Sequence, residues 1–208
     1  MIAAQIEHED HVAAVTTAKQ RKNEWRRIET LSEIAIAVAL KGKHEEARTI
    51  FASAFYYAQQ VVTDDRSWTA HSLNLLGEKQ AKAGEKDEAR ATFATAVKAT
   101  QQIEEEFRRA SLLRSIAIQM ARSGFLDDAL DVTELILISR SWNLAFIVEA
   151  FAEIGNKEYF KRLLLPCALY LDAAYAMCGH LARLYPEQAA GIAEVIQQQE
   201  HLDKPSEG

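Results

Sequence analysis

Four glycines, each flanked by the same arrangement of apolar residues, constrain the fold of this chain more than any other feature. They serve as anchors for four copies of one pattern: copy one around Gly42, copy two around Gly84, copy three around Gly124 and copy four around Gly155. Around each glycine the apolar residues recur at steps of three and four, the spacing of one face of an α-helix. Each copy is therefore predicted to be a helix, a tight glycine turn and a second helix.

The aligned columns predict how the two helices of a copy pack. Large residues stand eleven and eight positions before the glycines: Leu31, Leu73, Leu113 and Leu144, then Ile34, Leu76, Ile116 and Ile147. Seven positions before and five after, the residue is mostly small: Ala35, Gly77, Ala117 and Val148, then Ala47, Ala89, Ala129 and Phe160. Nine positions after stand Phe51, Phe93, Thr133 and Leu164. Small residues let two helices approach closely, and large ones fill the gaps beside that contact. A single hairpin cannot bury its apolar face alone, so neighbouring hairpins must stack.

This pattern resembles the tetratricopeptide repeat family, most closely over residues 31–54 and 73–96, and the resemblance covers about residues 25–168. The chain departs from the family in spacing, because its anchors lie 42, 40 and 31 residues apart whereas the usual unit has about 34 residues. It also has Leu where the family usually has an early Trp, and it lacks the Pro that often closes a unit. The resemblance implies an all-α, right-handed solenoid of antiparallel hairpins, with about 10–11 helices in a chain of this length.

The expected organisation is a single solenoid domain over residues 1–199. It consists of a half-hairpin, four repeats and a final helix pair, at residues 3–20, 23–62, 64–103, 109–138, 141–165 and 171–199. Residues 104–108 contain few helix breakers, so the second helix of copy two is expected to run almost unbroken towards copy three. Residues 200–208 have no periodic pattern and are expected to be a flexible tail.

Composition narrows the class of protein and its location. The net charge of −6 disfavours sequence-independent binding of nucleic acid. No run of about 18 apolar residues is present, so no membrane span is expected, and the N-terminus lacks the pattern of a secretory signal. The two cysteines, Cys167 and Cys178, indicate a reducing compartment and are expected to be buried, inert thiols. We therefore expect a cytoplasmic protein.

The resemblance also predicts where a partner would bind, because first helices line the concave groove of such stacks. The polar and aromatic residues at the inward positions are the expected contacts: His71, Asn74, Glu78, Arg114, Arg122, Trp142 and Glu149. The alternative is a solvated helix face that binds nothing. Recognition of a partner's C-terminal carboxylate is not expected, because the matching positions lack the required Lys, Arg or Asn: Ser32, Ile36, Leu75, Ser111 and Ser115.

No catalytic or metal-binding set emerges from the sequence. His8 and His11 lie at helical spacing in the segment EHEDH, but no third and fourth ligand is evident, so surface residues are the expectation. We predict no enzyme activity, no cofactor and no metal. Arg27, Arg109 and Arg140 each stand fifteen residues before an anchor glycine, and we expect this recurring arginine to join neighbouring copies by pairing with acidic residues of the preceding helix.

The sequence therefore favours a non-enzymatic scaffold that binds a peptide or helix of a partner protein in its groove. The alternative is a regulatory, ligand-sensing module of a larger signalling ATPase or transcription regulator. A homo-oligomer is a further possibility, because four aromatic residues could leave apolar surface at the N-terminal end: Trp25, Phe55, Tyr56 and Tyr57.

Overall fold

The structure, a computed structural model, describes residues 11–60, 66–163, 167, 169 and 171–187. The chain divides into two compact units, Met1–Ser139 and Arg140–Gly208, and each is described by itself. The division comes where the backbone of Ser139 adopts a φ of 45°, one residue before the first helix of the second unit. Whether residues 1–199 act as one domain stays a prediction.

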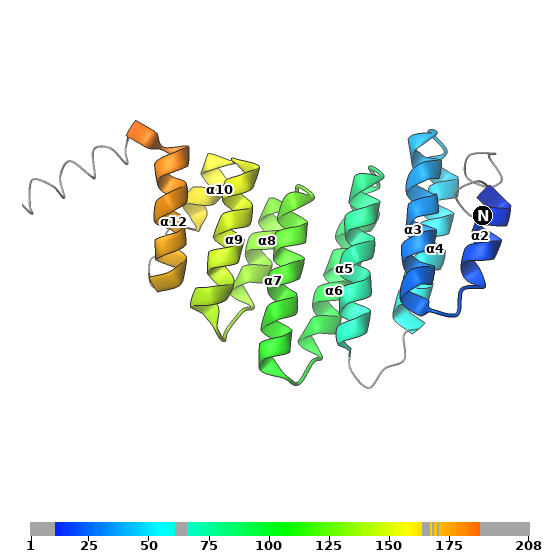
Figure 1. Cartoon of the computed structure of the whole chain (residues 1–208), viewed down its shortest axis with the longest axis horizontal. Coiled ribbons are helices and arrows are strands. Elements are labelled where there is room, and N and C mark those ends of the chain that lie inside the picture. The colour runs from blue at the N-terminus through cyan, green and yellow to red at the C-terminus, as the bar shows by residue number, and fades with distance from the viewer. Residues whose placement is uncertain (1–10, 61–65, 164–166, 168, 170, 188–208) are drawn as a thin grey trace, which may run out of the picture. The chain divides into compact units, whose positions relative to one another are not determined.

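The first unit is built from helical hairpins. Its helices are α2 (His11–Lys19), α3 (Glu24–Leu40), α4 (His44–Gln60), α5 (Ser67–Lys82), α6 (Lys86–Gln101), α7 (Glu106–Arg122) and α8 (Leu126–Glu134). The pairs α3–α4, α5–α6 and α7–α8 are the hairpins of copies one, two and three. Figure 1 shows α3, α5 and α7 in one row, here called the first-helix layer, with α4, α6 and α8 behind it as the second-helix layer.

The second unit continues the all-α architecture. Its described helices are α9 (Arg140–Ile154), α10 (Lys157–Arg162) and α12 (Leu171–Leu184), and α9 packs against both of the others. The prediction of an all-α solenoid of stacked hairpins is therefore confirmed. The expected tail over 200–208 lies outside the described residues, as does most of the last expected helix.

Two helix boundaries differ from the prediction. The expected near-continuous helix through residues 104–108 is wrong, because α6 ends at Gln101 and α7 begins at Glu106. Glu105 makes the break, since its carboxylate accepts hydrogen bonds from the backbone N–H groups of Phe107 and Arg108, both at 2.9 Å, and so caps α7. The second helix of copy three is shorter than expected and ends at Glu134.

The anchor glycines make the turns that the sequence predicts. All four have a left-handed φ, between 73° and 89°, which a residue with a Cβ adopts only at a cost. In copy two the N–H of Gly84 donates to the carbonyl of Ala81 at 3.1 Å and the N–H of Glu85 to that of Gln80 at 3.0 Å. The same two bonds recur in copies one and three. This Schellman arrangement satisfies carbonyls that a helix C-terminus otherwise leaves open.

The small-residue columns bring the helices of a hairpin into contact. A Cβ added to Gly77 would lie 2.9 Å from two ring carbons of Phe93, so α5 and α6 touch at this point. Ala35, Ala89 and Ala117, from the same two columns, are fully buried. The small residues at these two aligned positions therefore mark a close contact between the helices of a hairpin, as expected.

The recurring arginine joins neighbouring copies, but not through acidic residues. The guanidinium of Arg27 donates to the carbonyl oxygen of Arg21 at 2.9 and 2.5 Å, and that of Arg109 donates to the carbonyl oxygen of Ile103 at 2.7 Å. In both cases the acceptor lies six residues earlier, just beyond the preceding helix. The expected pairing with acids of the preceding helix is wrong for these two, because each guanidinium instead binds a main-chain carbonyl of the loop that follows that helix.

The second-helix side of copy one meets copy two through a buried carboxylate. Glu85 is 2% exposed and accepts hydrogen bonds from His44 Nδ1 at 2.8 Å and Arg48 Nε at 2.6 Å. Burial by itself would raise the pKa of this carboxyl, but the hydrogen bonds from Arg48 and His44 outweigh it and hold the pKa below its usual value. Arg48 also lies 3.2 Å from Glu88, which like Glu85 belongs to copy two.

Copy two meets copy three through an aromatic ring at the equivalent position. Phe125, like Glu85, directly follows its glycine, is 6% exposed and packs edge-on against Phe93 with 5.8 Å between ring centroids. Lys86 and Arg90 lie over its ring at 5.4 and 5.5 Å. Arg90 also pairs with Asp128 at 2.9 Å.

The cysteines and histidines differ from one another in burial. Cys167 is buried, as expected, and burial raises the pKa of its thiol to about 11, so the unreactive protonated form prevails. The expectation of burial is wrong for Cys178, which is exposed because the neighbouring Met177 takes the buried side of α12. The expectation of a surface residue is wrong for His11, which is 3% exposed; His8 lies outside the described residues.

Candidate functional site

The first-helix layer of unit 1 brings together five of the seven expected contact residues. His71, Asn74 and Glu78 come from α5, whereas Arg114 and Arg122 come from α7. On α5 the three residues are three and four positions apart and so share one face. Neighbouring first helices contact each other, α3 with α5 and α5 with α7. The structure therefore offers one continuous surface across copies one to three.

An aromatic cluster lies where α3 meets α5. The ring of His71 stacks on Trp25 with 5.0 Å between centroids and an interplanar angle of 17°. Trp68 meets Trp25 edge-on at 6.4 Å. His71 is exposed and Trp68 is 52% exposed, whereas Trp25 is half-buried. Two large rings and an imidazole thus remain reachable from solvent.

The amide of Asn74 lies deeper than a groove contact would. Asn74 is 6% exposed, and its Nδ2 donates to Ser115 Oγ of α7 at 3.2 Å. Its side chain therefore joins two neighbouring first helices and offers little surface to a partner. Arg114 of α7 is half-buried, with Nη2 3.4 Å from Ser111 Oγ. Burial lowers the pKa of the Arg114 guanidinium, although an arginine remains charged at neutral pH.

A hollow of about 350 Å³ opens between the C-terminal ends of α5 and α7. It is lined by Glu78, Ala81, Lys82, Lys86, Gln119, Arg122 and Ser123. Two expected contacts, Glu78 and Arg122, therefore face the same space. Three cations and one carboxylate line the hollow, and the carboxylate of Glu78 already pairs with Lys82. Lys86 donates to the carbonyl of Ser123 at 2.8 Å. A net positive lining in a chain of net charge −6 favours an acidic ligand at this point.

Two further expected contacts lie in unit 2, on α9. Trp142 is 51% exposed and meets Phe146, one turn further along, edge-on at 4.9 Å. Glu149 is exposed. That these two residues share a groove with those of α5 and α7 stays a prediction.

Sequence reasoning missed Trp68 and Lys86. Trp68 could have been found, because Trp25 and Trp68 stand seventeen and sixteen positions before their glycines, at almost the same place in successive copies. Lys86 follows the turn, outside the positions expected to face a groove, and nothing in its spacing marks it.

Among the residues that the structure describes, no group of three or more potential metal ligands comes together. None of the described helices combines the length and apolar character needed to cross a membrane.

The helices of copies one and two match a known protein family. Residues 26–102, which contain the hairpins of copies one and two, match the model of the tetratricopeptide repeat family. This segment consists of tetratricopeptide-like repeats. Copy three extends the same hairpin geometry beyond the matched segment.

A solved structure shares the fold over a longer stretch. The crystal structure of Ton1535 from Thermococcus onnurineus NA1 matches with a TM-score of 0.60 at 17% sequence identity, over 94% of this chain and 56% of that one. At this identity the likeness concerns the fold alone. This chain spans little more than half the length of that protein. No curated protein matches this chain.

Proposed function

We propose that the chain is a non-enzymatic scaffold that binds a peptide or helix of a partner protein on the first-helix layer of unit 1. Tetratricopeptide repeats generally mediate protein–protein interactions, and the observation that carries the proposal is the basic hollow between α5 and α7. It holds two of the residues expected to contact a partner, Glu78 and Arg122, on a preformed surface. Preformed surfaces bind at a lower entropic cost than flexible ones.

The proposal includes how the partner is oriented. His71 and Glu78 are seven residues apart on α5, about 10 Å along the helix axis. An extended or helical segment spanning that distance contacts the aromatic cluster with an apolar residue and the basic hollow with an acidic one. Aromatic and arginine side chains are the usual anchors of an interface.

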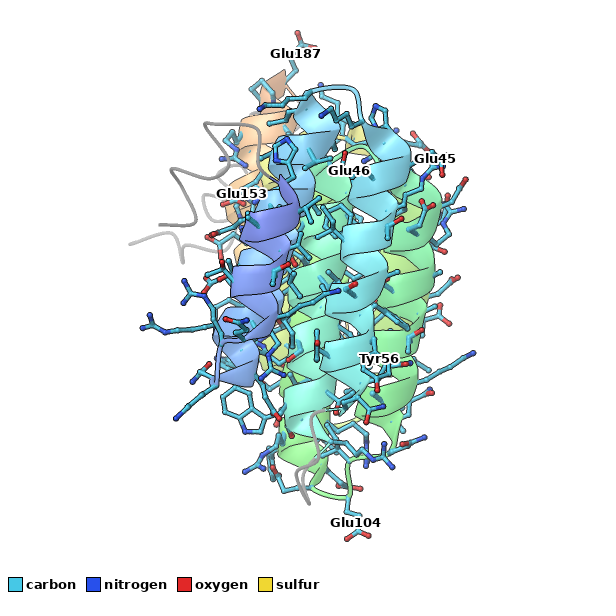
Figure 2. The ribbon with its side chains drawn as sticks, turned by 90° about the vertical axis from the view of Figure 1, so that its right-hand side faces the viewer. Glu45, Glu46, Tyr56, Glu104, Glu153 and Glu187 are labelled. Atoms are coloured by element: carbon cyan, nitrogen blue, oxygen red, sulfur yellow. The ribbon has the colours of Figure 1, made fainter. Side chains whose placement is uncertain are left out.

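The test is affinity capture with the purified chain, comparing wild type with Trp68→Ala and Arg122→Glu. Both side chains are exposed, so circular dichroism should show unchanged helix content. The matched controls lie on the second-helix layer: Tyr56→Ala removes an equally exposed aromatic residue, and Lys98→Glu makes the same charge change as Arg122→Glu. Figure 2 shows Tyr56 at the surface near the C-terminal end of α4, with Glu45 and Glu46 near its other end.

A partner captured by wild type and both controls, and lost or weakened about tenfold or more by each test variant, supports the proposal. Equal capture by all five proteins places the interface elsewhere and overturns it. Binding to Arg122→Glu should also lose its dependence on salt, because that dependence comes from the charge in the hollow.

A further inference from the structure

The basic hollow between α5 and α7 has a charge that a single carboxylate does not balance. Its lining holds three cations, Lys82, Lys86 and Arg122, and one carboxylate, Glu78, which leaves a net charge of +2. A side-chain carboxylate of a partner would neutralise half of that charge. A phosphate monoester carries a charge of about −1.5 to −2 at pH 7 and presents three acceptor oxygens. The lining therefore matches a phosphate group better than a carboxylate.

The three cations do not recur at the preceding junction of the stack. They stand two positions before and two positions after the glycine of copy two, and two positions before the glycine of copy three. At the junction of copies one and two, the same positions hold Leu40, His44 and Lys82. Leu40 is uncharged, and His44 is hydrogen-bonded to Glu85. The hairpin stack therefore does not require a cation at each of these positions.

Both lysines of the hollow are held in place and retain donors for a ligand. Lys86 is the first residue of α6, where the helix dipole disfavours a cation, yet its ammonium donates to the carbonyl of Ser123 at 2.8 Å. Lys82 is held in turn by the carboxylate of Glu78. A lysine ammonium has three N–H donors, and the described residues take one from each lysine. Two donors on each therefore stay available for the oxygens of a bound anion.

We propose that this hollow binds a phosphorylated serine or threonine of the partner segment. The inference rests on the proposed function and specifies the acidic residue that contacts the hollow. Of the seven lining residues, all in the described part of the chain, Ala81 alone is apolar. The lining therefore offers little apolar surface to the ring of a phosphotyrosine, and it has no aromatic side chain on which the base of a nucleotide could stack.

The test is an NMR titration of the full chain with capped phosphoserine, which is N-acetyl-phosphoserine amide. The comparison compound is the sulfate ester of the same capped serine, which has the same tetrahedral shape but a single negative charge. Wild type should bind capped phosphoserine saturably and about fivefold or more tightly than the sulfate ester. One additional charge close to a cation in a site open to water is worth about 1 kcal/mol, which corresponds to that ratio.

Two variants change the charge of the lining in opposite directions. Lys86→Gln should weaken the binding of capped phosphoserine about fivefold or more, whereas Glu78→Gln should strengthen it. Lys98→Gln is the matched control, because it removes a positive charge from an exposed position of α6 outside the hollow, and it should bind like wild type. Thermal unfolding of each variant separates loss of binding from loss of fold.

Three results overturn the inference: no saturable binding of capped phosphoserine to wild type, equal affinity for the phosphate and sulfate esters, or undiminished binding by a folded Lys86→Gln variant. The proposed function is tested separately. If capped phosphoserine does not bind but partner capture still depends on Trp68 and Arg122, the inference alone is wrong. If capped phosphoserine binds as expected but partner capture is unaffected by both variants, the proposed function is wrong.

Discussion

At the position directly after the turn glycine, copy two has Glu85 and copy three has Phe125, and both side chains are buried against the preceding copy. Two basic residues meet them, two and six positions after the preceding glycine. These are His44 and Arg48 in the first case and Lys86 and Arg90 in the second.

The comparison shows that basic residues at the same two positions can join copies by two different mechanisms. Around Glu85 the two basic side chains make direct hydrogen bonds to a carboxylate, whereas around Phe125 they lie over the face of a ring, which carries partial negative charge. The junction tolerates either residue because both present negative charge to basic side chains at the same two positions of the preceding copy. The Phe125 junction adds burial of a large apolar ring, and the Glu85 junction adds dependence on pH.

The largest effect is expected from Phe125→Ala, which removes the ring from the junction of copies two and three. The free energy of unfolding should fall by about 3–5 kcal/mol, the usual cost of deleting a buried phenyl group. Urea denaturation measures it, with Phe107→Ala, at a 69% exposed position, as the control that should change little. A loss below about 1 kcal/mol would show that the ring contributes little to the junction.

A smaller effect is expected from Glu85→Ala. The loss should be about 1.5–3 kcal/mol at pH 7, because hydrogen bonds to a charged group are removed, while the exposed His44 returns to water and Arg48 keeps its pairs with Glu45 and Glu88. Glu104→Ala is the matched control, since Glu104 is an exposed acid between α6 and α7 (Figure 2). If both variants unfold alike, the buried carboxylate does not stabilise its junction.

The same pair of proteins tests the pH dependence of the Glu85 junction. Because the folded-state pKa of Glu85 lies below the ordinary value of 4.5, its stabilisation is fully present above pH 4.5 and disappears as the pH falls through the folded-state pKa. The difference in stability between wild type and Glu85→Ala should therefore be constant from pH 7 to about pH 5.5 and shrink at lower pH. The difference between wild type and Phe125→Ala should not follow that course. If the difference in stability between wild type and Glu85→Ala stayed constant down to pH 3, the buried carboxylate of Glu85 would not be the source of the stabilisation.

The smallest effect is expected from Arg90→Ala. Arg90 is largely exposed in its pair with Asp128, so the loss should be less than about 1 kcal/mol. Raising the salt concentration to about 1 M should remove most of the part due to Asp128, because exposed pairs are screened. A large, salt-independent loss would instead show that the cation above the ring provides most of the stabilisation at the Phe125 junction.

The hairpins could be predicted from the sequence because their determinants are local. A left-handed glycine and small residues at fixed distances from it specify the turn and the close contact, as Gly77 against Phe93 shows. The contacts between copies were less predictable, since the position after the glycine holds Lys43, Glu85, Phe125 and Asn156 and forms no column. Glu85 looks like an ordinary surface acid until the basic residues of copy one are placed beside it.

The candidate site, like the rest of the fold, could be predicted from the sequence only in part. Its helices and the shared position of Glu78 and Arg122 followed from the register of successive copies. The burial of Asn74 did not, because a residue at the edge of a helix–helix contact turns inwards or outwards according to its neighbour's side chain, here Ser115. Exposure at such an edge depends on packing that periodicity does not specify.

The arginine bond to a backbone carbonyl has a consequence for how such a chain can grow. In the segment before their own copy, Arg27 and Arg109 bind a main-chain oxygen, a group that every residue possesses, whereas their contacts with Tyr57 and Glu106 lie within their own copy. A hairpin that begins with this arginine can therefore follow any helix end, whatever its sequence. A duplicated unit would bring its own connector with it, and its first joint would require no matching mutation in the segment before it.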